Sequence, residues 1–189
     1  MPTKPKARDK RKRLVDAAAK LSYEHGFNST SLADIARDSG VPIGNVYFYF
    51  NSKESLGEAL VDKLAAEFAM LRTSWDALPE PRRRIEAFIQ MTVDNRDSLA
   101  RSGCPIGTLC AELHKERGPL AERAAAIFAG TIEWLAVQFR QLGKRSESHD
   151  LAVHLLSALE GASLLTHAFH DTSYATREAD RLRRWVRSL

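Results

Sequence analysis

Features that define several large protein classes are scarce or absent in these 189 residues. No run of about 18 uncharged apolar residues occurs, which is the length that a membrane-spanning helix needs. The basic N-terminus lacks the apolar stretch of a secretory signal. The two cysteines, Cys104 and Cys110, are too few for a disulfide framework and are typical of a reducing compartment. These absences predict a cytoplasmic protein without a transmembrane segment.

Motifs for catalysis are also missing. The sequence has no glycine-rich phosphate loop with its lysine, no serine-centred nucleophile elbow and no paired carboxylates in a cleft signature. We therefore expect neither enzymatic activity nor a cofactor. Metal sensing is a rival hypothesis without a CxxC or HxxxH pair to support it, although two of its possible ligands, His167 and His170, lie three residues apart. The possible ligands are Cys104, Cys110, His114, His154, His167 and His170.

The periodic segments are all helical, and no apolar alternation is sustained enough for a strand. Leu14, Ala18 and Leu21 repeat at helical spacing, and Gly26 closes this first helix. A short helix capped by Thr30 or Ser31 follows, and then one that starts at Pro42. Further helices are expected at 52–75, 85–101, 106–116, 119–142, 147–171 and 174–188. The sequence predicts an all-α fold.

Positive charge is concentrated near the N-terminus. Residues 1–56 hold ten Lys or Arg against six Asp or Glu, whereas the other 133 residues hold 18 of each sign. Seven of the ten cations lie between Lys4 and Arg13. A basic arm on an otherwise neutral chain favours a polyanionic partner, with Arg8 and Arg11 as candidate phosphate contacts. The alternative is a solubilising tail.

Residues 31–56 have the pattern of a helix-turn-helix motif. A short helix ends at Gly40, where a tight turn needs the left-handed conformation that glycine tolerates, and a second short helix begins at Pro42. In such motifs the second helix enters the major groove of DNA. Val46 and Phe50, four residues apart, should point inward, and Phe48 is expected in the core with them.

The other residues of the second helix suit DNA. Gly44 permits a close approach to the sugar–phosphate wall, and Asn45 offers the paired donor and acceptor that match adenine. Tyr47 and Tyr49 have hydroxyl groups that can donate to phosphates. Lys53, in the first turn of the next helix, can share a phosphate with backbone N–H groups. The full set of expected DNA contacts is Thr30, Ser31, Pro42, Ile43, Gly44, Asn45, Tyr47, Tyr49, Lys53, Arg8 and Arg11.

From Leu14 to Leu56 the sequence resembles the DNA-binding domain of TetR/AcrR-family transcriptional regulators. The matching positions are Ala18, Leu21, Gly26, Phe27, Thr30, Ser31, Ile35, Ala36, Gly40, Val41, Gly44, Tyr47, Tyr49, Phe50, Ser52, Lys53, Glu54 and Leu56. Many members carry histidine where this chain has Tyr49. The resemblance implies a three-helix DNA-binding domain with the basic arm at 1–56. It also implies a larger helical effector-binding and dimerisation domain at 57–189.

The resemblance further implies a homodimer that binds a palindromic double-stranded DNA operator. The last two helices are the expected interface, through Leu155, Leu159, Ala162, Leu165, Phe169, Leu182, Trp185 and Val186. The alternative for these residues is an intramolecular core. A small-molecule effector is expected to contact a mainly apolar set, although each member alone suits plain core: Phe68, Trp75, Phe88, Met91, Cys104, Leu109, Leu113, Ile127, Trp134, Glu160 and His167.

The stretch SGCPIGTLCAEL raises a second possibility for signal detection. Cys104 precedes Pro105 and is expected near a helix N-cap, where exposed N–H groups stabilise a thiolate. A Gly-Cys pair at this place resembles a TetR subgroup that includes sensors of reactive electrophiles. Cys110 is expected to be buried. The sequence thus predicts a repressor released by a small apolar or electrophilic molecule. The alternatives are a thiol-based or metal-sensing regulator and a constitutive architectural DNA binder.

Overall fold

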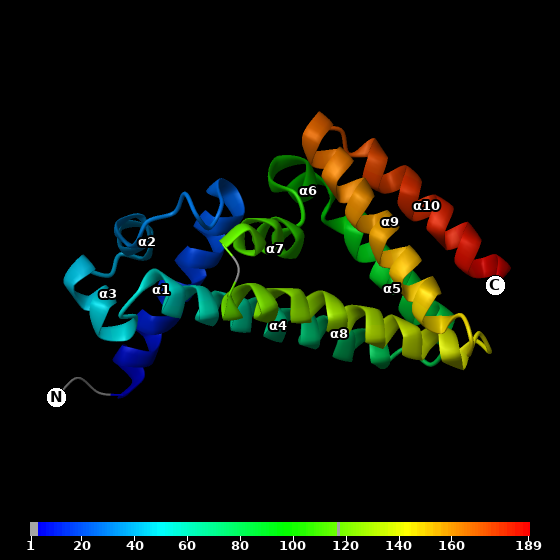
Figure 1. Ribbon diagram of the computed structural model, residues 1–189, viewed down its shortest axis with the longest axis horizontal. Coiled ribbons are helices and arrows are strands. Elements are labelled where there is room, and N and C mark those ends of the chain that lie inside the picture. Colours follow the sequence, from blue (N-terminus) through cyan, green and yellow to red (C-terminus); the bar gives the residue numbers. More distant parts are fainter. Residues whose placement is uncertain (1–3, 117) are drawn as a thin grey trace. The chain divides into compact units, whose positions relative to one another are not determined.

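The computed structural model describes residues 4–116 and 118–189, and in this part of the chain all regular structure is helical (Figure 1). The helices are α1 (Lys4–His25), α2 (Leu32–Ser39), α3 (Ile43–Tyr49), α4 (Lys53–Asp76), α5 (Pro81–Asp94), α6 (Arg96–Ser102), α7 (Pro105–Glu116), α8 (Pro119–Gln141), α9 (Ser148–Phe169) and α10 (Ser173–Ser188). The predicted all-α class is confirmed.

One predicted helix is divided. The segment 85–101 was expected to be continuous, but α5 ends at Asp94 and α6 begins at Arg96. The break falls at Asn95, whose side-chain Nδ2 and backbone N–H both donate to the carbonyl oxygen of Met91, at 2.8 and 3.1 Å. A side-chain amide that competes for backbone groups in this way ends helices.

The chain forms two compact units. One contains the described residues up to Glu67 together with those between Thr108 and Ala125, and the other contains Phe68–Gly107 and Ala126–Leu189. Helices α4 and α8 each contribute to both units. The division at residues 56 and 57 that the sequence suggested stays a prediction. The compact units are drawn differently, since α7 from Thr108 onward and the start of α8 belong to the unit that holds α1, α2 and α3.

The first unit is built around a small apolar core. Leu14 and Ala18 of α1, Ile35 of α2, Val46 of α3 and Phe50 after it are all at most 3% exposed. Helices α1 and α2 pack together, as do α2 and α3. Because α2 and α3 have only 8 and 7 residues, this shared core, and not helix propensity, holds them in place.

The second unit has a larger core of leucine and aromatic side chains. Helix α10 packs along α5 and α9, and α6 packs on α9. Figure 1 shows α9 and α10 side by side. The core residues of this unit include Ile85, Phe88, Phe139, Leu155 and Leu182, all at most 2% exposed.

Helix α9 is the one helix of the described residues that is long and apolar enough to cross a membrane. Its most apolar 18-residue window has a mean hydropathy of 1.2. This is weak evidence for a membrane span, because the core helix of a soluble protein has the same length and composition. Here Leu155, Leu156 and Leu159 of α9 pack in the core of the second unit.

Candidate DNA-binding surface and effector domain

The turn between α2 and α3 has the geometry of a helix-turn-helix motif. Ser31 caps α2 with a reciprocal pair of hydrogen bonds to Asp34, so of the two expected caps it is Ser31 that acts. Gly40 takes the left-handed conformation (φ 65°) as predicted, and the N–H of Val41 donates to the carbonyl of Ala36 at 3.1 Å. The guanidinium of Arg13 lies against Gly40 and donates to the carbonyl oxygen of Ser39.

Helix α3 has one buried and one open face. Val46 and Phe50 are buried, as predicted, whereas Ile43, Tyr47 and Phe48 are 45%, 58% and 81% exposed. The expectation that Phe48 lies in the core is therefore wrong. Two residues along a helix turn it by about 200°, so a side chain two positions after Val46 points to the opposite side.

The remaining candidate contacts on α3 are accessible to different degrees. Pro42 and Gly44 are exposed, and no atom lies within 4 Å of the place where a side chain at Gly44 would begin. Asn45 and Tyr49 are partly buried. The ring centres of Tyr49 and Phe48 lie 5.1 Å apart, and the rings meet edge to face. The open face of α3 thus combines apolar, aromatic and bare backbone surface.

Two candidate contacts before α3 are used within the fold. Thr30 is 4% exposed, and its hydroxyl donates to the carbonyl oxygen of Gly26 at 2.8 Å. The Ser31 hydroxyl is engaged with Asp34 in the cap of α2. Thr30 therefore does not present its hydroxyl as a surface contact, and Ser31 is exposed but already hydrogen-bonded.

Several cations of the basic arm also have partners inside the unit. The guanidinium of Arg11 lies 5.1 Å from the centre of the Phe50 ring, and Lys12 pairs with Asp16 at 2.6 Å. Arg8 is exposed at the start of α1. The arm is part of α1, which begins at Lys4, so its backbone is helical and not a separate tail.

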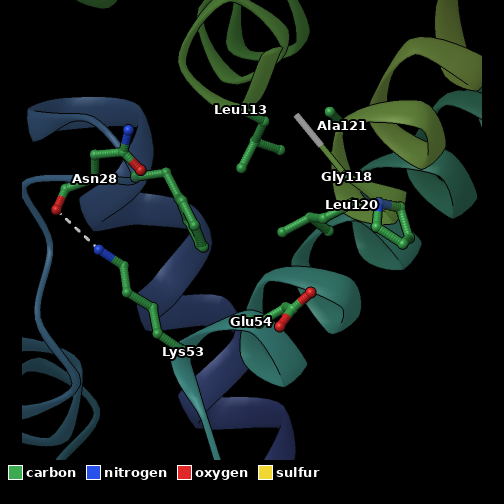
Figure 2. A pocket seen from close by; sticks show the side chains of 9 residues that line it. Asn28, Lys53, Glu54, Leu113, Gly118, Leu120 and Ala121 are labelled. Atoms are coloured by element: carbon green, nitrogen blue, oxygen red, sulfur yellow. Dashed lines mark hydrogen bonds between the residues drawn. The ribbon is translucent and has the colours of Figure 1, made fainter. Parts of the chain in front are cut away.

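Lys53 holds the turn between α1 and α2. Its Nζ donates to the carbonyl oxygen of Asn28 at 2.8 Å and lies 4.9 Å from the centre of the Phe27 ring (Figure 2). The sequence assigned this ammonium to a DNA phosphate. In the structure it contacts Asn28 and Phe27 of the α1–α2 turn, which the sequence did not indicate, and the phosphate contact stays a prediction.

Glu112 of α7 reaches the same turn. Its Oε2 accepts from the backbone N–H of Asn28 at 2.9 Å, and a side chain at Gly26 would begin 2.9 Å from its Oε1. The missing side chain of Gly26 makes room for this carboxylate, and glycine also tolerates the positive φ at this position. No local sequence pattern marks Glu112, because its partner lies 84 residues away.

A cavity of about 420 Å³ lies beside this turn (Figure 2). Of the expected effector contacts only Leu113 lines it. Its walls are mixed, with polar groups near the turn and apolar groups from α7 and α8: Phe27, Asn28, Lys53, Glu54, Leu113, Gly118, Pro119, Leu120 and Ala121. Leu109 is in the same unit and is 5% exposed.

Four of the other expected effector contacts form an aromatic cluster in the second unit. Phe88, 2% exposed, has its ring centre 5.6 Å from that of Trp75, 6.4 Å from that of Phe68 and 6.3 Å from that of Trp134. Met91 packs against the same core, and Ile127 is 8% exposed in this unit. Phe88 and Trp75 are core residues of the chain itself.

Cys104 lies at the start of α7, as predicted, but its environment is the opposite of the expected one. The Gly107 N–H donates to its Sγ at 3.4 Å, which is the geometry of a cap. Burial, and to a smaller extent the nearby Glu160 carboxylate, raise the pKa of the Cys104 thiol to about 12, although the Gly107 N–H acts in the opposite direction. The pKa of Glu160 is itself raised, by burial. The expectation of a stabilised thiolate is therefore wrong, because burial and a like charge outweigh the helix N-terminus.

We expect Cys104 to react slowly with iodoacetamide at pH 8. A pKa near 12 instead of 9.0 leaves a thiolate fraction roughly 1000-fold smaller, and the greater nucleophilicity of a basic thiolate recovers a factor of about 20. Alkylation should therefore be about 50-fold slower than for a peptide thiol. Mass spectrometry of the Cys110→Ser variant would follow Cys104 alone, and Glu160→Gln should speed the reaction because it removes the negative charge. Reaction at the peptide rate would contradict the burial of this thiol.

The same shift gives a direction for stability. The folded chain holds the thiol proton more tightly than the unfolded chain, whose thiol ionises near pH 9.0. The stability that this thiol contributes is therefore fully present below pH 9. The free energy of unfolding decreases as the pH rises from 9 towards 12, because the unfolded chain releases this proton and the folded chain keeps it.

The two histidines considered as metal ligands share one acceptor. Nδ1 of His167 and Nδ1 of His170 lie 3.3 and 3.0 Å from the carbonyl oxygen of Ala100, and their ring centres are 5.9 Å apart. They join α6 to the end of α9. Across residues 4–116 and 118–189, no group of three His, Cys, Asp or Glu is placed to hold a metal ion.

Most of the residues proposed for a dimer interface are buried in the single chain. Leu155, Leu159, Ala162, Leu182 and Val186 are at most 5% exposed, which corresponds to the intramolecular alternative. Trp185 is partly buried against Phe139 and His154. Leu165 and Phe169 remain exposed, and Leu164 and Tyr174 are exposed with them.

Comparisons with known proteins agree with this architecture. Residues 14–60 match the family model of bacterial regulatory proteins, tetR family, and residues 81–178 match that of the C-terminal domain of LmrA/YxaF-like transcriptional regulators. An uncharacterized HTH-type transcriptional regulator of Mycobacterium tuberculosis is 31% identical over 85% of this chain and 86% of its own. The HTH-type transcriptional repressor NemR of Escherichia coli is 28% identical over 76% of this chain and 72% of its own.

Solved structures give the same result for the fold. A TetR transcriptional regulator from Chloroflexus aurantiacus has a TM-score of 0.83 at 24% identity and covers 96% of each chain. The second family model spans more than half of the chain, and the relative from Mycobacterium tuberculosis is alike over most of both sequences. The chain therefore belongs to the TetR family of bacterial transcriptional regulators, which bind DNA through a helix-turn-helix domain.

Proposed function

We propose that this regulator is a repressor that binds a palindromic operator as a homodimer and leaves it when a small molecule binds in the helical domain. Regulators of this family bind DNA operators and usually act as dimers with small-molecule effectors. The observation that carries the proposal is the open face of α3, where Ile43 and Tyr47 project from a helix anchored through Val46 and Phe50. Such a helix suits the major groove. Its site of action is then the cytoplasm, and we propose no catalytic role.

Two substitutions test the DNA-binding part. Asn45→Ala should change which base pair is preferred, because a paired donor and acceptor discriminates bases by about 1–3 kcal/mol. Lys53→Ala should weaken binding to all sequences alike, since its ammonium contacts a phosphate or the Asn28 carbonyl and no base. Selection from a random duplex pool, followed by titration of matched and mismatched duplexes, measures both effects.

Equal, sequence-independent losses for the two variants would contradict the role of Asn45 in base recognition. An unchanged Lys53→Ala variant would limit Lys53 to its contact with Asn28. The two results are separate, so one variant serves as the control for the other.

The repressor part is supported by a relative, because NemR is named a repressor and is 28% identical over 76% of this chain. The effector part is supported by the composition of the second unit. The candidate contacts near the aromatic cluster are mainly apolar, as in most small-molecule sites. A ligand that binds more tightly, by about 1–3 kcal/mol, to an arrangement of the dimer that cannot bind DNA lowers the DNA affinity by roughly 5- to 150-fold.

Two links are available for the coupling. Helix α4 contributes to both compact units, and Lys53 at its start holds the α1–α2 turn. Glu112 of α7 hydrogen-bonds to the same turn. A displacement of α4 or α7 would therefore act on the α1–α2 turn, which leads into the helix-turn-helix motif that contains α3. A gel shift with and without candidate compounds separates this mechanism from a constitutive architectural role.

Covalent sensing through Cys104 is the second candidate, and the raised pKa of the thiol ranks it after reversible binding. A solved structure of NemR, 22% identical in a superposition that covers 93% of this chain, is described as a reduced form. If Cys104 is the sensor, an alkylating electrophile should release DNA from the wild type and from Cys110→Ser, but not from Cys104→Ser. Release that persists in Cys104→Ser would assign the response to a reversibly bound effector. Metal sensing ranks last.

A further inference from the structure

Phe48 has the largest exposed fraction, 81%, among the exposed large hydrophobic residues in the described part of the chain. A phenyl ring in water forgoes the gain of about 25 cal/mol for each Å² of apolar surface that burial would give. The ring lies on the open face of α3, together with Ile43 and Tyr47. This concentration of apolar surface on a seven-residue helix indicates a partner with an apolar feature.

The position of the ring is well defined. Val46 and Phe50 fix the rotation of α3, because both are buried in the core of the first unit. Phe48 therefore points outward, and its ring centre lies 5.1 Å from that of Tyr49, with the two rings nearly perpendicular. Gly44, one turn earlier on the same face, leaves open space beside it. A flat ring with only two rotatable bonds next to bare backbone can be placed against a base edge at little cost in conformational entropy.

The chemistry of the major groove leaves one good target for such a ring. Most groups on the base edges there are hydrogen-bond donors or acceptors, and the C5 methyl of thymine is the apolar exception. The phosphate wall is charged, and a phenyl group cannot bond to it. We propose that Phe48 packs on the C5 methyl of a thymine in each operator half-site and so makes that thymine a requirement for tight binding. The proposal rests on the sequence-specific DNA binding proposed above.

The test replaces single thymines by deoxyuridine in the duplex that the full-length protein selects from a random pool. Deoxyuridine removes the methyl and keeps the Watson–Crick edge and O4. At one position in each half-site we expect an approximately fourfold loss of affinity per methyl, which corresponds to about 0.8 kcal/mol for a buried methylene-sized group. Because Phe48→Ala removes the contact in both half-sites, it should bind the thymine duplex at least about 16-fold more weakly, or roughly fourfold for each half-site. It should bind thymine and deoxyuridine duplexes equally at that position.

The control variants separate this role from a general defect. Phe48→Leu keeps an apolar side chain and should keep part of the preference for thymine. Met70→Ala removes another exposed apolar side chain, 65% exposed on α4, and should bind like the wild type. Because Phe48 is so exposed, Phe48→Ala should unfold at the wild-type temperature, which circular dichroism would verify.

Three outcomes would overturn the proposal. A wild-type protein that is indifferent to deoxyuridine at every position has no methyl contact. A Phe48→Ala variant that keeps the full preference for thymine shows that another residue makes that contact. In both cases sequence-specific binding stands. If no duplex is enriched from the pool, the proposed function fails together with the inference.

Discussion

Removal of residues 1–10 is expected to weaken binding to all duplexes by on the order of 100-fold near 0.15 M salt. The deletion takes away four cations, Lys4, Lys6, Arg8 and Lys10, and one acid, Asp9. Each phosphate that a cation neutralises contributes about 0.9 to the slope of log K against log salt, or roughly fivefold at this salt concentration. In the proposed homodimer both arms are removed, and with about three of their cations at phosphates the salt dependence should flatten by about three such contacts. Titrations between 50 and 200 mM salt measure both effects.

The structure defines where this truncation should stop. Arg11 lies over the Phe50 ring and Arg13 donates to the Ser39 carbonyl, so these two cations support the helix-turn-helix unit. Arg11→Ala is the matched control. We expect it to lower the unfolding temperature, whereas deletion of 1–10 should leave it nearly unchanged. If the deletion alters neither affinity nor salt dependence, the arm is a solubilising segment and takes no part in DNA binding.

Phe88→Ala is expected to lower the free energy of unfolding by about 3–5 kcal/mol. Phe88 is 2% exposed and meets Phe68, Trp75 and Trp134 in one aromatic cluster. The substitution removes the transfer free energy of the ring and leaves a cavity that the neighbouring rings cannot fill. Urea unfolding of the effector-free protein, followed by circular dichroism, measures the change.

Met70→Ala provides the comparison, because Met70 is 65% exposed and its loss should change the free energy of unfolding by less than about 0.5 kcal/mol. A decrease of under about 1 kcal/mol for Phe88→Ala would contradict a core role. Combined with a weaker response to an effector, that result would make Phe88 a ligand contact, as the sequence analysis suggested.

Local sequence determined most of the DNA-binding unit. Ser31 and Gly40 set the ends of α2, one through a capping box and the other through its left-handed conformation. Val46 and Phe50 follow the helical period and are buried. These signals depend on neighbours in the chain, so they were visible without a structure. Phe48 was placed in the core because it is aromatic, although the helical period turns it outward.

The tertiary structure decided the features that depend on distant partners. Glu112 meets Asn28 across 84 residues. Burial, together with the Glu160 carboxylate nearby, reverses the direction expected for the pKa of Cys104. The sequence predicted the apolar faces of α9 and α10. A periodic row of leucines does not indicate whether such a face packs inside its own chain or against a second copy. In the structure Leu155 and Leu182 are in the core of their own chain, and Leu165 and Phe169 are exposed. The sequence by itself determined the helices, the turn and the family motif, because these are encoded by residues a few positions apart. Burial and charge at a site are sums over all elements that pack around it, so only the folded chain sets them.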